Sequence, residues 1–380
     1  MYDLLGQKMN ASAINLLDPA PGRLSQVEVR QIDLEAWQQF VEDHPDSTVF
    51  HHRHWIEALA AQYGSRCVIL AALNERRIIT AIPLLETRSL LGARKLVSLP
   101  FSDCVPLLWA KTDDEDSCAS SGEDERCAAA WQALCTHLRS AAYQRYRAIV
   151  LRLSAPPAGV PSESHFFRHV IDLGRAYEAV RAGYSQGIRR NLKTAASKGL
   201  AFAMRIDPAA MDLFYDLHVR TRQKLGVPVQ PKSFFQRLQD RVIAQGLGWV
   251  GLVMHGPQPA AAAVFLTFKT NMNYKFGASR PDLLDLRPNE LLYDNAIRWA
   301  IERGFRELDL GVSDKDQDGL CAFKRKLGAA QSEAYRVFIT GKPHLMMRQW
   351  RARHWVAGLI QRSPTFVCRG LGKLFYRYSQ

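Results

Sequence analysis

One stretch in the second half of the chain, residues 249–279, reads WVGLVMHGPQPAAAAVFLTFKTNMNYKFGAS. Its apolar runs are separated by two turn signals, HGPQP at 255–259 and TN at 270–271. Short apolar runs divided by Gly, Pro and Asn are typical of strands joined by tight turns. The stretch therefore predicts a three-stranded meander, with strands over 249–254, 260–268 and 272–277.

A helix and a further strand are expected directly after this meander. Residues 289–303 have a helical pattern, and Gly304 follows at the position where a glycine commonly ends a helix. The stretch 305–310 then predicts a strand. A helix between two strands commonly returns the chain parallel to an earlier strand, so this order indicates an α/β fold with mixed sheets.

The first half of the chain predicts the same order of elements. Helical residues 50–63 precede three strands, and a helix over 125–143 leads into a β-branched strand over 148–153. The three strands are expected at 67–73, 77–85 and 95–99. A pattern seen twice indicates two similar halves packed together, rather than one large sheet. We divide the chain into a lead-in, two halves and a tail, at 1–25, 26–170, 171–341 and 342–380.

The composition is that of a globular protein. Of the 380 residues, 47% are hydrophobic and 23% are charged, which excludes a disordered or collagen-like chain. No apolar run approaches the roughly 18 residues that span a bilayer, and residues 1–10 lack the features of a signal peptide. We therefore expect a cytoplasmic protein.

Neither the cysteines nor the histidines indicate a metal site. The seven cysteines have no close C-x-x-C spacing, and we expect reduced thiols. His51, His52 and His54 are not one helical turn apart, so they are expected to form the polar start of a helix anchored by Phe50 and Trp55.

The net charge of +13 is concentrated in two places. Residues 342–380 contain eight Lys or Arg and no Asp or Glu. A predicted helix capped by Ser185 has a basic face formed by Arg189, Arg190 and Lys193. Such a face can be merely solvated, or it can bind a phosphate-rich substrate, and both interpretations stay open.

The tail also has an apolar helical face. It consists of Val367, Leu371, Leu374, Phe375 and Tyr378, and Arg369, Lys373 and Arg377 lie opposite. A helix of this kind either contacts an anionic membrane surface or docks on the rest of the protein.

Four motifs follow one another in the second half: YKFGAS at 274–279, LRPN at 286–289, LDLG at 308–311, and GLxxFKRxxG at 319–328. In this order they resemble the FemAB-type transferases of the GNAT acyltransferase superfamily, including those encoded with bacterial exopolysaccharide (PEP-CTERM/exosortase) systems. The resemblance implies two tandem GNAT-like domains, related by internal duplication, that face each other across a cleft. It also implies transfer of an acyl or aminoacyl group to an amine of a peptidoglycan or exopolysaccharide precursor, at the inner face of the cell membrane.

The resemblance implies roles for three residues. Phe323 and Lys324 match the functional Phe-Lys pair of the family, and Asp103 falls where the family has an acceptor-side aspartate. Acyl transfer requires a neutral amine and stabilisation of developing negative charge. Asp103 is therefore a candidate to accept the proton of the amine, and Lys324 a candidate to neutralise phosphate or leaving-group charge. The alternatives are a turn-forming aspartate and an exposed lysine in a basic run.

Three further residues are candidates for contacts with substrate. Tyr274 lies where GNAT folds separate two strands to admit the donor, and it is a catalytic candidate because its hydroxyl can bond the reacting carbonyl or amine there. Packing explains an aromatic residue in a strand equally well. Arg222 is expected to face the cleft and contact phosphate. Asn289 begins the crossover helix and can orient a donor at the helix N-terminus.

The donor is expected to be a co-substrate, with no permanently bound cofactor. The stretch 277–288 contains one glycine, and a glycine-poor segment cannot easily present successive N–H groups to the pyrophosphate of coenzyme A. Aminoacyl-tRNA or an acyl group on another carrier is therefore preferred. Three alternatives stay open: an acyl-CoA-dependent enzyme that modifies a sugar amine or small molecule, a non-catalytic nucleic-acid-binding protein, and an inactive membrane-peripheral partner. DNA is not an expected partner, because no DNA-binding module is evident.

Overall fold

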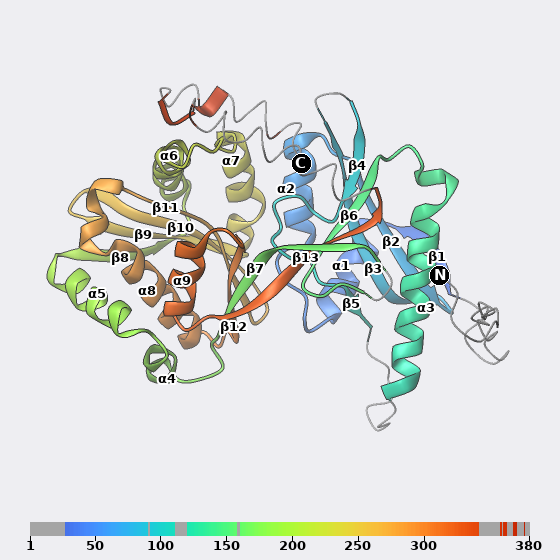
Figure 1. Ribbon diagram of the computed structural model, residues 1–380, viewed down its shortest axis with the longest axis horizontal. Helices are drawn as coiled ribbons and strands as arrows, with labels where there is room; N and C mark the ends of the chain where they lie inside the picture. The colour runs from blue at the N-terminus through green and yellow to red at the C-terminus, as the bar shows by residue number, and fades with distance from the viewer. Residues whose placement is uncertain are drawn as a thin grey trace, which may run out of the picture.

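The computed structural model describes residues 27–89, 92–110, 120–157 and 160–341, together with 358, 360–362, 368–370 and 376. The strands of this part of the chain form one mixed sheet of thirteen strands, covered by helices on both faces (Figure 1). The predicted α/β fold with a mixed sheet is confirmed.

The first half has the predicted order of elements. Its three meander strands are followed by a helix, and the next strand, β6, then pairs in parallel with β4. The elements are β1 (Glu28–Ile32), α1 (Leu34–Asp43), α2 (Arg53–Tyr63), β2 (Cys67–Asn74), β3 (Arg77–Arg88), β4 (Arg94–Val97), β5 (Leu108–Trp109), α3 (Ser120–Arg139), η1 (Ala141–Tyr143), β6 (Ala148–Leu153) and β7 (Ser162–Asp172).

The second half repeats this order. Strand β12 pairs in parallel with β11, as β6 does with β4. The elements are α4 (Tyr177–Ala182), α5 (Gln186–Ser197), β8 (Leu200–Arg205), α6 (Pro208–Lys224), α7 (Lys232–Arg241), η2 (Ile243–Gln245), β9 (Gly248–His255), β10 (Gln258–Phe268), β11 (Asn271–Ser279), η3 (Pro281–Leu286), α8 (Pro288–Glu302), β12 (Glu307–Asp314), α9 (Asp318–Lys326) and β13 (Ala330–Thr340).

The two halves exchange their last strands. Strand β7 follows the first half in sequence but pairs with β12 of the second half, and β13 follows the second half but pairs with β6 of the first. The strands β7 and β13 also pair with each other and cross between the halves in Figure 1. The repeated order agrees with two similar halves, but the expectation that they form separate sheets is wrong, because these two strands join the halves into one sheet. The division at 170/171 falls within β7 and stays a prediction.

Local signals placed several helices correctly. The Ser185 side chain accepts a hydrogen bond from the Ile188 N–H and caps α5, as the sequence predicts. His52 caps α2 in the same way, which confirms the predicted polar start of that helix. Gly304 follows α8 with a positive φ of 76°, a conformation that glycine adopts readily.

The largest core cluster lies between the two halves. It combines residues of α1 and α2 from the first half with residues of α6 and α7 from the second, such as Trp37, Trp55, Phe214 and Phe235. The opposite sheet faces have separate cores, under α3 in the first half and under α8 in the second. Burial of shared apolar surface therefore fixes the halves against each other.

Polar contacts reinforce this central interface. The Lys269 ammonium, in the turn between β10 and β11, donates to the backbone carbonyls of Val41, Glu42 and His44 at the end of α1. A cation at the end of a helix satisfies carbonyls that have no partner within the helix. The β10–β11 turn of the second half is thus anchored to the first half.

The described residues of the tail contact the rest of the protein. Ile360 and Cys368 are fully buried in the central core, and Arg369 forms an ion pair with Asp216 at 3.3 Å. The predicted apolar face of Val367, Leu371, Leu374, Phe375 and Tyr378, with Lys373 and Arg377, lies outside the described residues. Within the part of the chain that the structure describes, no helix combines the length and hydropathy of a membrane span.

Acid should destabilise the fold through the buried His51 ring. Its Nδ1 accepts from the Thr48 N–H, and its Nε2 lies 3.0 Å from the Pro106 carbonyl oxygen. Burial lowers the pKa of His51 from 6.5 to about 4. Between these pH values the unfolded chain binds a proton that the folded chain does not, so the free energy of unfolding should fall by about 3 kcal/mol as the pH drops from 6.5 to 4.

Urea unfolding across this pH range tests this expectation. The variant His51→Gln should show a shallower pH dependence than the parent, because its side chain does not titrate. Equal slopes for the two proteins would contradict the assignment to His51.

Candidate active site

The parallel strands β11 and β12 separate after a short paired segment. They pair at Asn271–Asn273 and Glu307–Asp309, and each strand then continues without pairing to the other. The gap that opens between them begins at Tyr274. This separation is the feature that the sequence analysis expected at Tyr274.

A β-bulge lies at the start of the gap. Val264 of β10 pairs with Phe276 and Phe265 pairs with Tyr274, so Lys275 is the extra residue of the bulge. The bulge reverses the alternation of side chains: Tyr274 packs in the core under α8, whereas Phe276 packs in the central core. Bulges commonly redirect a side chain next to an active site.

The first half contributes Asp103 to this gap. The Lys275 Nζ lies 2.9 Å from the Asp103 Oδ2, and both side chains are largely buried. The loop that carries Asp103 is held by Ser102, whose Oγ accepts from the Trp55 indole and whose carbonyl accepts from the Arg152 guanidinium. Asp103 thus forms an ion pair across the two halves, in place of the simple turn contact that the sequence left open.

Gly311 of β12 lies on the other side of the gap. Its φ is +70°, and a Cβ built there would lie 3.2 Å from the Asp103 Oδ2. Its N–H donates to the Asp309 Oδ1 at 2.7 Å, while the Asp309 Oδ2 accepts from the Arg168 Nε at 2.8 Å. The Arg168–Asp309 pair therefore fixes a backbone turn that only glycine adopts readily.

Lys324 of α9 reaches the same turn. Its Nζ donates to the Gly311 carbonyl at 2.9 Å, and the residue is 2% exposed. Burial lowers the pKa of Lys324 to about 8, and the nearby carboxylates of Asp103 and Asp309 offset part of this effect. The alternative of an exposed lysine in a basic run is therefore wrong for Lys324, because α9 directs this side chain inward.

Aromatic rings line the α8 side of the gap. The Tyr274 ring lies 4.9 Å from the Tyr293 ring, which lies 5.5 Å from the Phe323 ring. Burial raises the pKa of the Tyr274 hydroxyl, and a hydrogen bond with Tyr293 offsets part of this rise. Among the predicted site residues, the structure thus brings together Asp103, Tyr274, Phe323 and Lys324.

Two of the predicted substrate-binding arginines have partners within the protein. Arg189 donates to the carbonyls of Ala182 and Tyr184, at the start of its own helix. Arg222 donates to the Pro228 carbonyl and to the Tyr376 hydroxyl. The Arg222 guanidinium is thus held by the loop after α6 and by the tail, and its predicted contact with phosphate stays a prediction.

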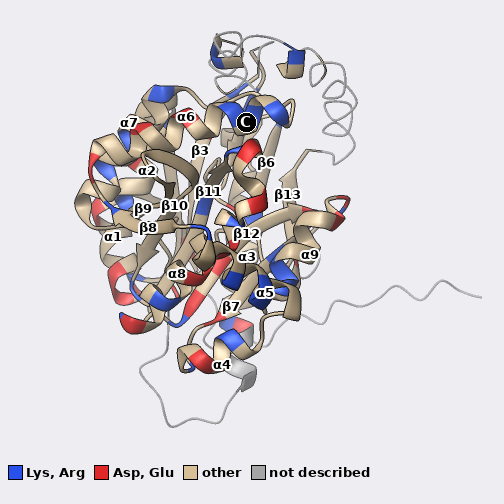
Figure 2. Ribbon diagram, turned by 90° about the vertical axis from the view of Figure 1, so that its left-hand side faces the viewer, with Lys and Arg blue, Asp and Glu red and all other residues tan. Residues whose placement is uncertain are grey.

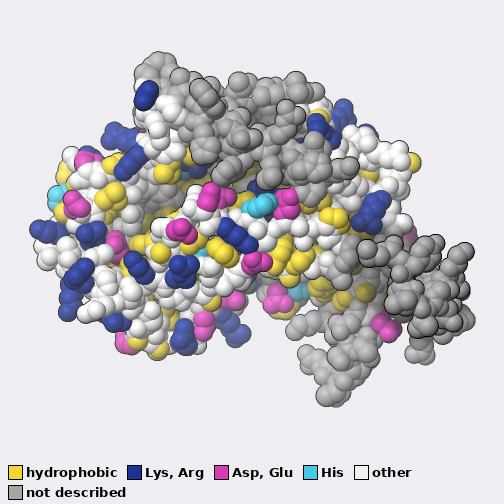
Figure 3. Space-filling view, in the orientation of Figure 1, with side chains coloured by type: hydrophobic (Ala, Val, Ile, Leu, Met, Phe, Trp, Pro, Cys, Tyr) yellow, Lys and Arg dark blue, Asp and Glu magenta, His cyan; other side chains and the backbone are white. Residues whose placement is uncertain are grey.

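The remaining predicted binding residues are more accessible. Arg190 and Lys193 are exposed on α5, and Asn289 is half-buried at the second position of α8. Helix α5 begins where α9 ends, since the Ser185 N–H donates to the Lys326 carbonyl at 2.8 Å. Figure 2 shows the basic residues of α5 and α9 on neighbouring segments, and Figure 3 shows Lys and Arg interspersed with acidic side chains on the face of Figure 1.

The segment between β11 and α8 is compact. Residues 281–286 form the short helix η3, in which backbone N–H groups of Leu283 and Arg287 bond to carbonyls within the segment. The Arg280 guanidinium holds Asp282 and Gln258. The N–H groups of Leu283 and Arg287 therefore already have acceptors within the segment.

The corresponding gap of the first half is filled by its own chain. After β4 and β6 pair, the Ser98 N–H bonds to the Val150 carbonyl and the Val105 N–H to the Arg152 carbonyl. The cavity beside this loop measures ≈ 10 Å³, which is too small for a substrate group. Of the two gaps, the one in the second half, which contains the predicted site residues, is therefore taken as the candidate site.

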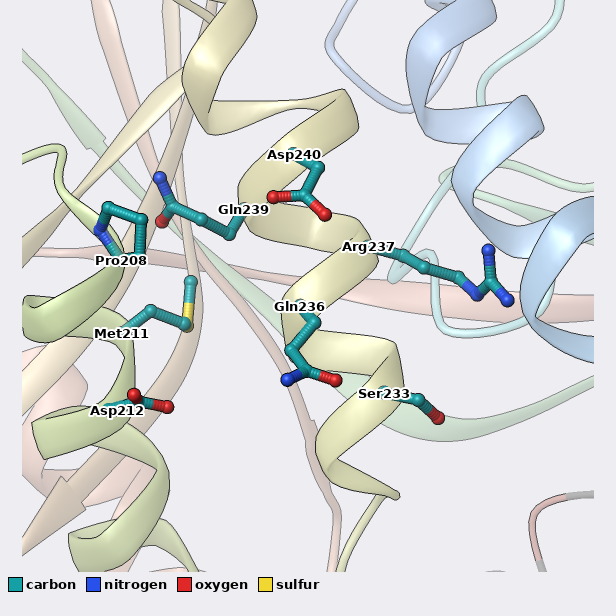
Figure 4. Close-up of a pocket in the computed structure, with 8 residues that line it drawn as sticks. All are labelled: Pro208, Met211, Asp212, Ser233, Gln236, Arg237, Gln239 and Asp240. Carbon is teal, nitrogen blue, oxygen red and sulfur yellow. The ribbon is translucent and has the colours of Figure 1, made fainter.

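A larger cavity of ≈ 380 Å³ lies between α6 and α7 (Figure 4). It contains none of the predicted site residues. Its lining residues are Pro208, Met211, Asp212, Ser233, Gln236, Arg237, Gln239 and Asp240. Among the described residues, no group of three His, Cys, Asp or Glu is arranged to hold a metal ion.

Comparison with known proteins agrees with this fold. Residues 182–325 match the family model of the acetyltransferase (GNAT) domain. The crystal structure of FemX is similar with a TM-score of 0.59 and 14% identity, over 81% of this chain and 96% of that chain. Residues 182–325 therefore form a GNAT acetyltransferase domain, and the chain as a whole has a fold similar to that of FemX.

A second solved structure is similar to this acyltransferase. It is the C-terminal domain of a putative lysylphosphatidylglycerol synthetase from Agrobacterium fabrum, with a TM-score of 0.50 and 13% identity, over 81% of this chain and 93% of that chain. At these identities the two structures support the fold alone. No curated protein matches the sequence of the acyltransferase.

Four residues of the candidate site were not predicted from the sequence: Arg168, Lys275, Asp309 and Gly311. The Asp-x-Gly spacing of LDLG is a turn signal that could have indicated the last two. Lys275 stands in the YKFGAS motif, but the bulge that redirects it depends on pairing with β10. Arg168 lies in β7, a strand that was not predicted.

Proposed function

We propose that the acyltransferase moves an acyl or aminoacyl group onto an amine of a cell-envelope precursor, at the gap between β11 and β12. The observation that carries this proposal is the meeting of Asp103, Lys275 and the buried Lys324 at Gly311. In transfer, the amine nitrogen attacks the carbonyl carbon, and the bond from that carbon to the carrier breaks, with its electron pair staying on the carrier oxygen or sulfur. The proton that the amine loses balances the proton that this carrier atom takes up. The first half supplies the negative charge of Asp103, and the second half supplies the positive charges of Lys275 and Lys324, around one reacting centre.

The proposed roles follow from charge and position. The Asp103 carboxylate can accept a hydrogen bond from the incoming amine and orient it for attack. The Lys324 ammonium supplies a positive charge next to the Gly311 turn, where charge grows on the carrier oxygen or phosphate. Because the side chain is buried, this charge is less screened by water than a surface lysine would be.

Aminoacyl-tRNA is the preferred donor. Backbone N–H groups of the η3 segment already bond to carbonyls within the segment, so they are poor donors for a pyrophosphate. The exposed cations Arg190 and Lys193 suit a phosphate-rich carrier. Contact between residues 342–380 and anionic lipid remains part of the proposal and would keep the enzyme near a lipid-linked acceptor.

A matrix of donors and acceptors tests this function. The purified protein would be incubated with alanyl-tRNA or acetyl-CoA, and with a nucleotide-linked muropeptide or an amino sugar. Mass spectrometry should show the acyl group on the amine of the muropeptide with the tRNA donor. Transfer from acetyl-CoA to the amino sugar alone would favour the acyl-CoA alternative. Absence of transfer in every combination would contradict an active enzyme.

The Lys275–Asp103 pair gives a specific prediction for this assay. The variant Lys275→Met removes the positive charge that holds Asp103 and should lower kcat/KM by about 10-fold or more, since the carboxylate loses its fixed position. Lys275→Arg should retain more activity, because the charge is kept. If both variants transfer as fast as the parent, the pair does not position Asp103.

A further inference from the structure

We infer that Tyr274 sets the upper size limit of the acyl group that the site accepts. This inference rests on the proposed function, because it places the acyl group in the gap between β11 and β12. Tyr274 is the first residue of β11 beyond the paired segment, so it lies where the two strands begin to separate. It therefore acts as a specificity-determining residue through its ring.

The position of the ring depends on Gly277. The Tyr274 side chain folds along β11 and covers Gly277 so closely that a Cβ built there would overlap the hydroxyl oxygen and lie 2.6 Å from Cζ. Gly277 has no positive φ, so its backbone conformation does not require glycine. The glycine instead leaves room for the ring.

The bulge explains why the ring and the glycine share one face. Lys275 is the extra residue, so Tyr274 points toward α8, and Gly277 alternates with Phe276 and Ala278, which pack in the central core. A strand without this bulge would place positions 274 and 277 on opposite faces. The local geometry of β11 thus places an aromatic ring directly over Gly277.

Neighbouring aromatic rings hold Tyr274 in this position. The Phe265 ring lies 5.7 Å away at an interplanar angle of 68°, and the Tyr293 ring lies 4.9 Å away. The ring of Phe323, which precedes Lys324 on α9, packs against Tyr293 and extends this row of aromatic rings. A small acyl group can reach Lys324 beside these rings, whereas a bulky acyl group would have to displace the Tyr274 ring.

A stability measurement tests the geometry without any substrate. In the parent protein, Gly277→Ala forces the new Cβ against the ring and should lower Tm by about 3–10 °C. In the Tyr274→Ala background the same substitution should lower Tm by less than about 1 °C. An equal loss in both backgrounds would show that the ring does not occupy the space over Gly277, and would overturn the inference.

Donor binding tests the specificity. The probes are acetyl-CoA and octanoyl-CoA, and tRNA carrying alanine or phenylalanine through a stable amide bond. For whichever carrier the parent binds, the Kd ratio of the bulky to the small acyl group should fall at least 10-fold in Tyr274→Ala and stay unchanged in Tyr274→Phe.

The outcomes separate the inference from the proposed function. An unchanged ratio in Tyr274→Ala, with the small donor still bound, overturns the size limit and leaves the proposed function intact. A ratio that falls equally in Tyr274→Phe assigns the effect to the hydroxyl group and also overturns it. Failure of the parent to bind any of the four probes contradicts the proposed function, and the size limit loses its basis with it.

Discussion

Replacing Lys324 by alanine should lower kcat of acyl transfer by about 10²–10³, the usual cost of removing one group that stabilises charge in the transition state. The loss should appear in kcat and kcat/KM alike, because the charge is needed only as the reaction proceeds. The variant should also lose about 1–3 kcal/mol of stability, since the buried Gly311 carbonyl loses its donor. Steady-state kinetics at saturating donor, with urea unfolding in parallel, measure both effects.

The neighbouring cations provide matched controls for Lys324. Arg325 and Lys326 are exposed on the same helix, so Arg325→Ala and Lys326→Ala should weaken binding in a salt-dependent way and leave kcat nearly unchanged. Equal losses of kcat in all three alanine variants, reproduced by added salt, would mean that Lys324 has no role beyond a basic surface.

Replacing Arg168 by methionine should destabilise the fold by about 3 kcal/mol or more. Asp309 is 5% exposed, and the substitution removes the Arg168 Nε that lies 2.8 Å from its carboxylate. Removing one member of a buried ion pair is costly because the other charge stays buried. The Gly311 turn should shift with Asp309, so transfer activity should fall as well.

The Arg175–Asp172 pair near the end of β7 is the matched control. Both of its side chains are more than half exposed, and exposed pairs contribute at most about 1 kcal/mol. Arg175→Met should therefore change the free energy of unfolding by less than about 1 kcal/mol. Equal effects of the two substitutions in urea titrations would show that Arg168 and Asp309 do not form a structural pair.

Much of the fold could be predicted because its signals are local. Apolar runs, turn residues and helix ends at Ser185 and Gly304 fixed the meanders and crossover helices of both halves. The exchange of β7 and β13 could not be predicted, because it depends on pairing between strands that are far apart in sequence. The pattern of β7, SESHFFRHVID, has no clean alternation, since the strand lies between two halves and is buried along only part of its length.

The site could be predicted only in part for a related reason. Lys324 and Asp103 were recognised as residues of interest, but burial of Lys324 follows from the docking of α9 on the Gly311 turn. The partner of Asp103 is 172 positions away and is directed to it by a bulge. Arg222 illustrates the opposite case, because nothing in its local sequence indicates the contact with Tyr376.

The pH dependence of kcat tests the central claim, a buried ammonium at the transfer site, most directly. The measurement is the ratio of kcat for the parent to kcat for Lys324→Arg, from pH 6 to pH 10, in which titration of the substrates cancels. Arginine stays charged over this range, whereas the pKa of Lys324 is lowered to about 8 by burial. The ratio should be constant below pH 7 and fall steeply above pH 8 as Lys324 loses its proton. A ratio that stays constant to pH 10, or that rises above pH 8, would contradict a catalytic positive charge on Lys324.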